Sequence, residues 1–245
     1  MGRHLLITKY LMVDTAARDK LMDIMTNISK SVAANEPDVL RYALLIPTDD
    51  DDRKTMYSIE EYIDDQVFQT HLATTEVKNM FAWVSSAPGQ VFAPVGGVVC
   101  DRLDIHLDVP ALGFVRPSLA RHADPCIVVE EVEYEKDRIK ETLPGWRAVV
   151  EAARDKEIGT LMLGVYPYHR DAFAGEGGGQ AVGSEKLFVV GAYESEEYWR
   201  DVHGGLGESL EGVTAATVQG RIGHERAVMK MKGGFLVRDS GAGSG

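Results

Sequence analysis

The sequence predicts an α+β protein in which a ferredoxin-like βαββαβ module occurs twice in tandem. A short tag supports the duplication, because Leu112-Gly113-Phe114-Val115-Arg116 recurs near the end of the chain as Gly234-Phe235-Leu236-Val237-Arg238. The apolar periodicities of strands and helices also follow the same order on both sides of the midpoint. We therefore expect a first module over residues 1–120, a second over 121–238, and a flexible tail over 239–245.

In the first module, strands and helices alternate in the order that defines this fold. An apolar run at 5–13 predicts the first strand, and Asp14 or Thr15 can cap a helix that ends at Asn35-Glu36-Pro37. The other expected elements are strands at 40–46, 55–62 and 97–107, a short helix at 64–70, and a helix that begins at Thr75.

The second module repeats the order, with Pro144 expected to kink its long helix or to mark the true start. Its elements are expected as strands at 125–134, 160–166, 186–193 and 225–232 and helices at 137–156, 195–202 and 207–217, with a Gly-rich insertion at 174–183. A four-stranded sheet with its helices on one face leaves the other face bare. Two modules in one chain can cover each other's bare face, which predicts an intrachain dimeric α/β-barrel pseudo-dimer.

Composition excludes several classes of protein. The 245 residues include 26 Lys and Arg against 38 Asp and Glu, a net charge of −12, which argues against a nucleic-acid or an anionic membrane partner. The longest apolar runs fall short of a membrane span, and no secretory signal is evident, so we expect a cytoplasmic protein. With only Cys100 and Cys126, a disulfide framework and an all-cysteine zinc site are both excluded.

A run of polar residues after the third strand of the first module resembles a known family. In order, it contains Glu60-x-Tyr62, Asp64-Asp65, His71 and Thr74-Thr75. This run resembles the antibiotic biosynthesis monooxygenase family of the dimeric α/β-barrel superfamily. In the second module Tyr193 and His203 take the places of Tyr62 and His71, whereas Gly191 replaces Glu60.

The resemblance implies a tandem, pseudo-dimeric family member of a kind associated with fungal secondary metabolism. Members of the family include oxygenases that convert polyketide anthrones or phenols to quinones without flavin, haem or metal, and others that are not oxidative. We accordingly expect a cofactor-independent monooxygenase or tailoring enzyme. Its partners would be an aromatic polyketide-type small molecule and dioxygen, it would need no cofactor, and it would be a monomer or a homodimer.

Three residues are candidates for acid/base chemistry. An imidazole with a pKa near 6.5 can take a proton from an acidic phenol or enol, which points to His71 and His203. Either histidine could instead cap a helix or bond a backbone carbonyl. Glu60 could hold His71 in one tautomer, act as a base itself, or be a solvated carboxylate.

Aromatic residues could line a pocket for a flat substrate, although ordinary core packing would give the same sequence pattern. The candidate substrate-binding residues are Tyr42, Tyr62, Phe81, Trp83, Tyr166, Tyr198 and Trp199. In the run Asp104-x-His106-x-Asp108, strand alternation would place three candidate metal ligands on one face. A strand whose polar face meets solvent has the same sequence pattern, so we expect no metal site.

Two other functions remain open from the sequence. A lyase, isomerase or cyclase could use the same histidines on a β-keto or phenolic substrate, and a need for dioxygen would separate it from an oxygenase. For a non-catalytic ligand-binding or stress-response protein, His71→Ala and His203→Ala should leave the metabolite profile unchanged. Because the second module carries Gly191 in place of Glu60, we also expect the two pockets to differ.

Overall fold

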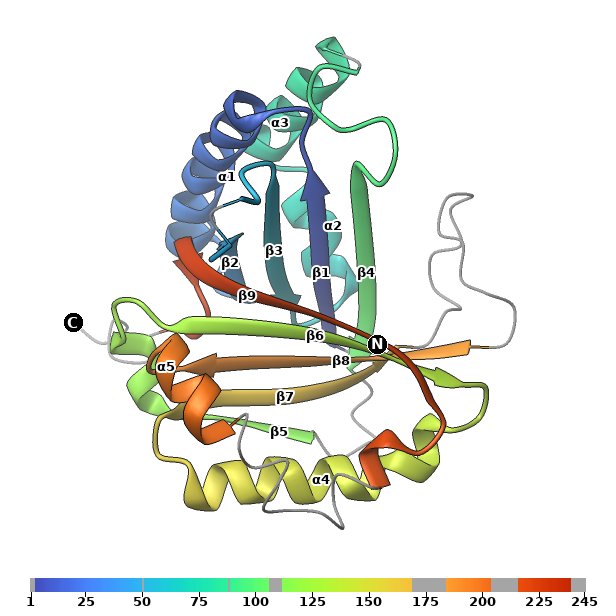
Figure 1. Cartoon of the computed structure of the whole chain (residues 1–245). Helices are drawn as coiled ribbons and strands as arrows, with labels where there is room; N and C mark the ends of the chain where they lie inside the picture. Colours follow the sequence, from blue (N-terminus) through green and yellow to red (C-terminus); the bar gives the residue numbers. More distant parts are fainter. Residues whose placement is uncertain are drawn as a thin grey trace, which may run out of the picture. The chain divides into compact units, whose positions relative to one another are not determined.

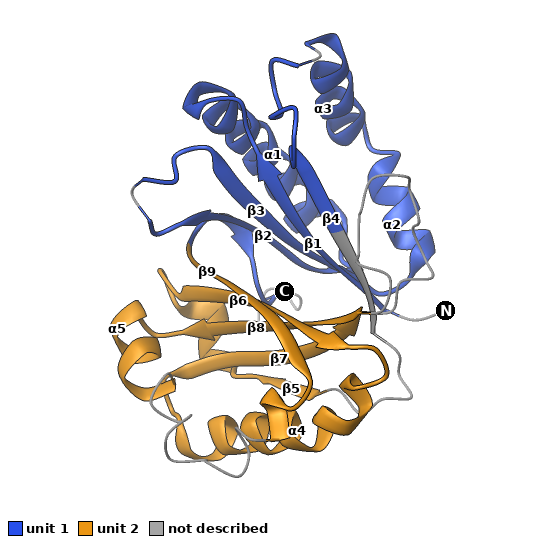
Figure 2. Ribbon diagram, turned by 45° about the vertical axis from the view of Figure 1, so that its right-hand side comes forward, with its two compact units in different colours: residues 1–106, 230–245 blue, residues 107–229 orange. Residues whose placement is uncertain are grey.

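The chain forms two compact units, coloured separately in Figure 2. The computed structural model describes residues 3–49, 51–87, 89–105 (101–105 by their backbone alone), 112–168, 184–203 and 216–238. Unit 1 consists of residues 1–106 and 230–245, and unit 2 consists of residues 107–229. The boundaries of the compact units therefore differ from those of the two sequence halves, 1–120 and 121–238.

Unit 1 contains the βαββαβ order with one additional short helix. Its elements are β1 (Arg3–Leu11), α1 (Thr15–Asn35), β2 (Val39–Pro47), β3 (Thr55–Tyr62), α2 (Asp65–Leu72), α3 (Thr75–Ser86) and β4 (Val98–Ile105). Helices α1 and α2 begin where the sequence supplies a capping aspartate: Asp14 accepts a hydrogen bond from the Ala17 amide at 2.8 Å, and Asp64 accepts one from the Val67 amide at 2.9 Å. The strand order is β4-β1-β3-β2-β9.

The three helices of unit 1 pack on one face of its sheet, which makes the core of the unit. In Figure 1, α1 runs along this sheet. The apolar residues at helical spacing along α1 predict one core-facing side, and of these Leu21, Met25, Ile28 and Val32 are buried while Ile24 is only partly buried. They meet residues that alternate along the strands, such as Leu6, Tyr42, Leu44, Met56 and Tyr62. Polar side chains on this strand face therefore lie inside the layer between sheet and helices.

Unit 2 repeats the arrangement, with α4 along its sheet in Figure 1. Its elements are β5 (Leu112–Val115), β6 (Cys126–Glu135), α4 (Ile139–Lys156), β7 (Thr160–Tyr168), β8 (Ser184–Tyr193), α5 (Glu196–Tyr198), the π-helical turn η3 (Trp199–His203) and β9 (Arg221–Phe235). Pro144 stands inside α4. The strand order is β9-β6-β8-β7-β5.

The last strand residues of each sequence half belong to the unit formed by the other half. The tag strand β5 follows β4 in sequence but pairs antiparallel with β7 in unit 2, with Leu112 opposite Val165. Strand β9 begins in unit 2, and its residues from 230 onward belong to unit 1. This exchange of strands is not evident from the apolar pattern.

The predicted fold class, two tandem ferredoxin-like modules in an α+β chain, is confirmed. The reciprocal exchange of terminal strands is consistent with the predicted pseudo-dimer. The Gly-rich stretch 174–183 and most of the predicted helix at 207–217 lie outside the described residues. Within the part of the chain that is described, no helix is both long and apolar enough to cross a membrane.

Candidate functional site

Unit 1 contains a buried cluster of polar side chains around Glu60. This carboxylate lies on the helix-facing side of β3 and accepts two hydrogen bonds, from Ser58 Oγ at 2.9 Å and from Tyr62 Oη at 2.6 Å. The Tyr10 hydroxyl lies 3.3 Å from Ser58 Oγ. Because Ser58 has a single proton and gives it to Glu60, Tyr10 must be the donor to Ser58. Strand alternation places all of these groups on one face of the sheet.

The tyrosines of this cluster remain protonated phenols at neutral pH. Burial raises the pKa of Tyr10, Tyr42 and Tyr62, and the negative charge of Glu60 raises each of them further. Tyr42 stands opposite Glu60 in the neighbouring strand β2. The tyrosines therefore act as hydrogen-bond donors, whereas Glu60 and the imidazole of His71 are groups that can accept a proton.

His71 is buried at the end of α2 and is held by a carboxylate that the sequence did not point to. Its Nδ1 lies 3.0 Å from Oε2 of Glu36, the residue that ends α1. Because an ionised carboxylate only accepts, Nδ1 carries the proton and Nε2 of the neutral ring is left as a proton acceptor. The ring lies between Tyr42 and Tyr62, with centroid distances of 5.6 and 5.5 Å.

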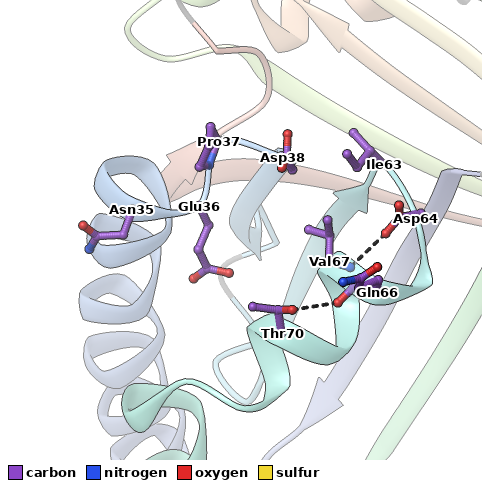
Figure 3. A pocket seen from close by; sticks show the side chains of 9 residues that line it. All are labelled: Asn35, Glu36, Pro37, Asp38, Ile63, Asp64, Gln66, Val67 and Thr70. Atoms are coloured by element: carbon purple, nitrogen blue, oxygen red, sulfur yellow. Dashed lines mark hydrogen bonds between the residues drawn. The ribbon is translucent and has the colours of Figure 1, made fainter.

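A cavity of about 410 Å³ borders this arrangement, a volume within the range of small-molecule sites. It lies between the end of α1 and the first turns of α2, and Figure 3 shows the Glu36 side chain extending from α1 toward α2. Its lining residues are Asn35, Glu36, Pro37, Asp38, Ile63, Asp64, Gln66, Val67 and Thr70. Polar groups thus continue inward from the cavity through Glu36, His71 and Tyr62 to Glu60.

Unit 2 contains a matching histidine–carboxylate pair. His203 Nδ1 lies 2.9 Å from Oε2 of Glu157, the residue that ends α4. The His203 ring lies 5.1 Å from the ring of Tyr193, the counterpart of Tyr62. Thr160 donates a short hydrogen bond to the same Glu157 oxygen. Both units therefore attach a histidine to the last turn of their long helix.

Among the described residues of unit 2, the positions that correspond to Ser58, Tyr42 and Glu60 hold other side chains. Gly191 stands two residues before Tyr193, as Glu60 does before Tyr62, and a Cβ at Gly191 would collide with the Tyr193 ring. Val189 takes the place of Ser58, and Leu163 stands opposite Gly191 where Tyr42 stands opposite Glu60. The tyrosine ring folds over the glycine, and no carboxylate fits beneath it.

The predicted aromatic residues are divided among several surroundings. Tyr42 and Tyr62 join the His71 cluster, whereas Phe81 is 51% exposed on α3. Trp83 packs partly buried against the core of unit 1 with Lys20 Nζ 4.9 Å from its ring centroid. In unit 2, Tyr198 and Trp199 pack around Tyr193, and Tyr166 folds over Gly164 on the other face of β7.

Glu36 and Glu157 are the site residues that sequence reasoning missed. Asn35-Glu36-Pro37 was interpreted only as a helix stop, and the available signal was an acidic residue at the end of the long helix in both repeats. Glu60 bonds Ser58 and Tyr62, so the carboxylate that orients His71 is Glu36 instead. No three His, Cys, Asp or Glu side chains of the described residues gather as a metal site, and His106 lies outside them.

The fold and the cluster define an α+β module that buries acid/base groups between its sheet and its helices. Residues 5–83 match the model of the antibiotic biosynthesis monooxygenase family. The matched segment contains Glu36, Glu60, Tyr62 and His71. No curated protein sequence is similar enough to match the chain.

Solved structures share the fold over nearly the whole chain. A candidate monooxygenase from Lactobacillus acidophilus is 11% identical with a TM-score of 0.68, covering 98% of this chain and 100% of its own. A candidate monooxygenase from Fusobacterium nucleatum is 16% identical with a TM-score of 0.67, covering 97% and 98%. An anthrone oxidase-like protein is 11% identical with a TM-score of 0.59, covering 95% and 92%. At these identities the similarity establishes the fold alone.

Proposed function

We propose that unit 1 is a cofactor-independent monooxygenase that oxidises an aromatic, polyketide-type small molecule with dioxygen. The observation that carries the proposal is the Glu60 cluster, a buried carboxylate that accepts hydrogen bonds from the neutral hydroxyls of Ser58 and Tyr62 beside the apolar core of unit 1. The family of the matching segment and the fold shared with an anthrone oxidase-like protein support the same class of reaction.

In the proposed reaction, Glu60 removes a proton from the benzylic carbon of the substrate, and His71 Nε2 accepts a hydrogen bond or a proton from a phenolic hydroxyl. The carbanion gives one electron to dioxygen, and the two radicals combine into a peroxide, which takes a proton from Glu60. Loss of water then leaves a carbonyl group. One CH₂ group and one O₂ thus give one C=O group and one H₂O.

The surroundings of these groups suit such a reaction. The layer between sheet and helices excludes water, which strengthens hydrogen bonds to a developing anion. The phenols of Tyr10, Tyr42 and Tyr62, kept protonated by their raised pKa, can donate such hydrogen bonds. Glu36 keeps His71 in the tautomer that leaves Nε2 as an acceptor.

Oxygen uptake by the full chain tests the proposal, with anthrone as the probe substrate. We expect one dioxygen consumed for each anthraquinone formed, and a kcat/KM for Glu60→Gln lower by about 10²-fold or more, because the amide cannot accept the proton. Glu76→Gln, at an exposed position on α3, is the control and should keep full activity.

Two outcomes would overturn the proposal. Turnover at an unchanged rate under strict anaerobic conditions would replace the oxygenase by a lyase, isomerase or cyclase. Binding of aromatic compounds without turnover, unaffected by Glu60→Gln, would indicate a ligand-binding protein instead.

A further inference from the structure

The two tag arginines each bind the end of a long helix, at the residue that holds the histidine. Arg238 donates from Nε to the Val39 carbonyl at 2.8 Å, from Nη1 to Ala33 at 3.0 Å, and from Nη2 to the carbonyls of Val32 and Glu36. One guanidinium thus bonds four main-chain oxygens across the end of α1 and the start of β2. The carbonyls of Val32, Ala33 and Glu36 lie at the C-terminal end of α1, the negative end of the helix dipole, which favours a cation. Those of Val32 and Glu36 also accept the amides of Glu36 and Val39.

Arg116 makes the equivalent bonds in unit 2. Its Nε donates to the Thr160 carbonyl at 2.8 Å, and its Nη2 donates to Arg154 at 2.6 Å and to Glu157 at 3.1 Å. In both units, therefore, Nε bonds the first residue of the following strand and Nη2 bonds the helix-ending glutamate. Each guanidinium also stacks on an aromatic ring of its own tag, that of Phe114 or Phe235.

The arginine and the histidine act on the same glutamate from opposite ends. The main-chain carbonyl of Glu36 accepts from Arg238 while its side chain accepts from His71 Nδ1. The Glu36 backbone leaves the helix at φ −122° and ψ 73°, close to the φ −107° and ψ 90° of Glu157. The Glu36 side chain starts at this backbone and must reach from the end of α1 to His71 on α2. An arginine that fixes the backbone therefore also fixes the point from which the carboxylate reaches the imidazole.

We propose that Arg238 is a positioning residue for His71, and that Arg116 has the same role for His203. Each arginine comes from the sequence half whose own histidine it does not contact through the glutamate. Arg116 lies in the first half and acts in unit 2, whereas Arg238 lies in the second half and acts in unit 1. The tag repeated in the sequence is thus the segment that completes each histidine–glutamate pair. The consequence for activity rests on the proposed function, and the consequence for the imidazole does not.

Nitrogen NMR of the histidine side chains in the full chain tests the inference, with signals assigned from His71→Gln and His203→Gln. In Arg238→Met we expect the His71 ring nitrogens to shift and to titrate as they do in Glu36→Gln, and those of His203 to stay unchanged. Arg116→Met is the matched control and should show the reverse pattern. Arg238→Lys keeps the charge but cannot bond four carbonyls, so its His71 shift should be smaller and in the same direction.

Three outcomes would overturn the inference. The His71 signals could stay unchanged in Arg238→Met while Glu36→Gln shifts them. Arg238 would then cap the helix without positioning the histidine. Both histidines could shift together in either variant, which would indicate a change of the whole fold. If Arg238→Met does not fold, an unshifted His71 in Arg238→Lys would count against the inference equally.

Oxygen uptake with anthrone separates this inference from the proposed function. If both hold, kcat/KM falls by about tenfold in Arg238→Met and stays unchanged in Arg116→Met, since one lost orienting contact costs less than a lost base. If the NMR pattern appears but the wild-type chain does not consume oxygen, the proposed function fails and the positioning role stands.

Discussion

Glu130 in β6 is a largely buried carboxylate that bonds two side chains of β9. Its Oε2 lies 2.9 Å from His224 Nε2, and its Oε1 accepts from Arg226 Nε at 2.8 Å. Burial alone raises the pKa of Glu130, but the bond from His224 and the charge of Arg226 outweigh it and hold the pKa below the ordinary value. A lowered folded-state pKa gives stability that is present above the unfolded pKa and is lost as pH falls through the folded one.

Glu130→Gln should therefore destabilise the protein at neutral pH and matter little in acid. We expect a loss of about 1–3 kcal/mol at a pH of about 6–7, because His224 and Arg226 lose the carboxylate that they bond. The loss should shrink as pH falls below the ordinary glutamate pKa of about 4.3 and disappear once pH has fallen through the lower pKa of the folded state. Urea unfolding across this range measures it.

The neighbouring carboxylate provides the control for this measurement. Glu225 is exposed, and Glu225→Gln should change the free energy of unfolding by less than about 0.5 kcal/mol at every pH. A Glu130→Gln loss that stays constant from neutral to acid would contradict a charge-based role.

At the scale of elements, the end of β9 approaches β2 at a glycine. Gly234 has φ +84°, and a Cβ there would collide with the carbonyl oxygen of Tyr42. Gly113, the tag glycine in β5, lies as close to β7, where a Cβ would stand 2.7 Å from the Leu163 carbonyl oxygen. Leu163 is the counterpart of Tyr42, so each tag needs a glycine to pack against the corresponding strand.

Gly234→Ala should destabilise unit 1 by about 2–4 kcal/mol, from the positive φ and the overpacking together. Gly89→Ala is the matched control, because Gly89 also has positive φ, +73°, but nothing lies within 4 Å of its added Cβ. We expect it to cost only about 1 kcal/mol. Equal losses in the two variants, measured by urea unfolding, would show that the close approach to β2 contributes nothing.

Elements with strong local signals could be predicted from the sequence. The strand at Thr55–Tyr62 was predicted with both of its ends, and the helix after Asp14 begins where a side chain caps it. The helix predicted from Ser195 begins there because its hydroxyl accepts the Tyr198 amide at 3.0 Å. In each of these cases the residues that set the boundary are neighbours in sequence.

The exchanged strands and the glutamate partners could not be predicted in this way. Strand β5 has only four residues, and its pairing partner β7 follows after α4. Glu36 meets His71 across 35 positions, and Arg238 meets Glu36 across 202. Such contacts depend on where whole elements lie, and the apolar period of a single element does not contain that information.

At the scale of the whole molecule, each unit has its own histidine–glutamate pair, and the Glu60 cluster belongs to unit 1. Under the proposed function, His71→Ala should lower kcat/KM for anthrone oxidation by about 10²-fold. His203→Ala should leave it unchanged, because Gly191 supplies no carboxylate beside it. Both variants should lose a similar amount of stability, about 1–3 kcal/mol, since each removes the histidine bond of a glutamate at the end of a long helix.

Oxygen uptake and urea unfolding on the same preparations check this comparison. Comparable losses of turnover in the two variants would mean that both units, or neither, carry the reaction. A large difference in stability would mean that the two histidine–glutamate pairs are not equivalent supports of their helices.

The exchange of β5 and the end of β9 between the two sequence halves limits how such a chain can evolve. Under the proposed function, a second half without turnover could still not be lost, because its residues 230–238 complete unit 1. Selection for turnover in unit 1 would therefore also preserve the second half, although Gly191 stands there in place of Glu60. Cleavage of the chain just before residue 230 would, for the same reason, damage unit 1.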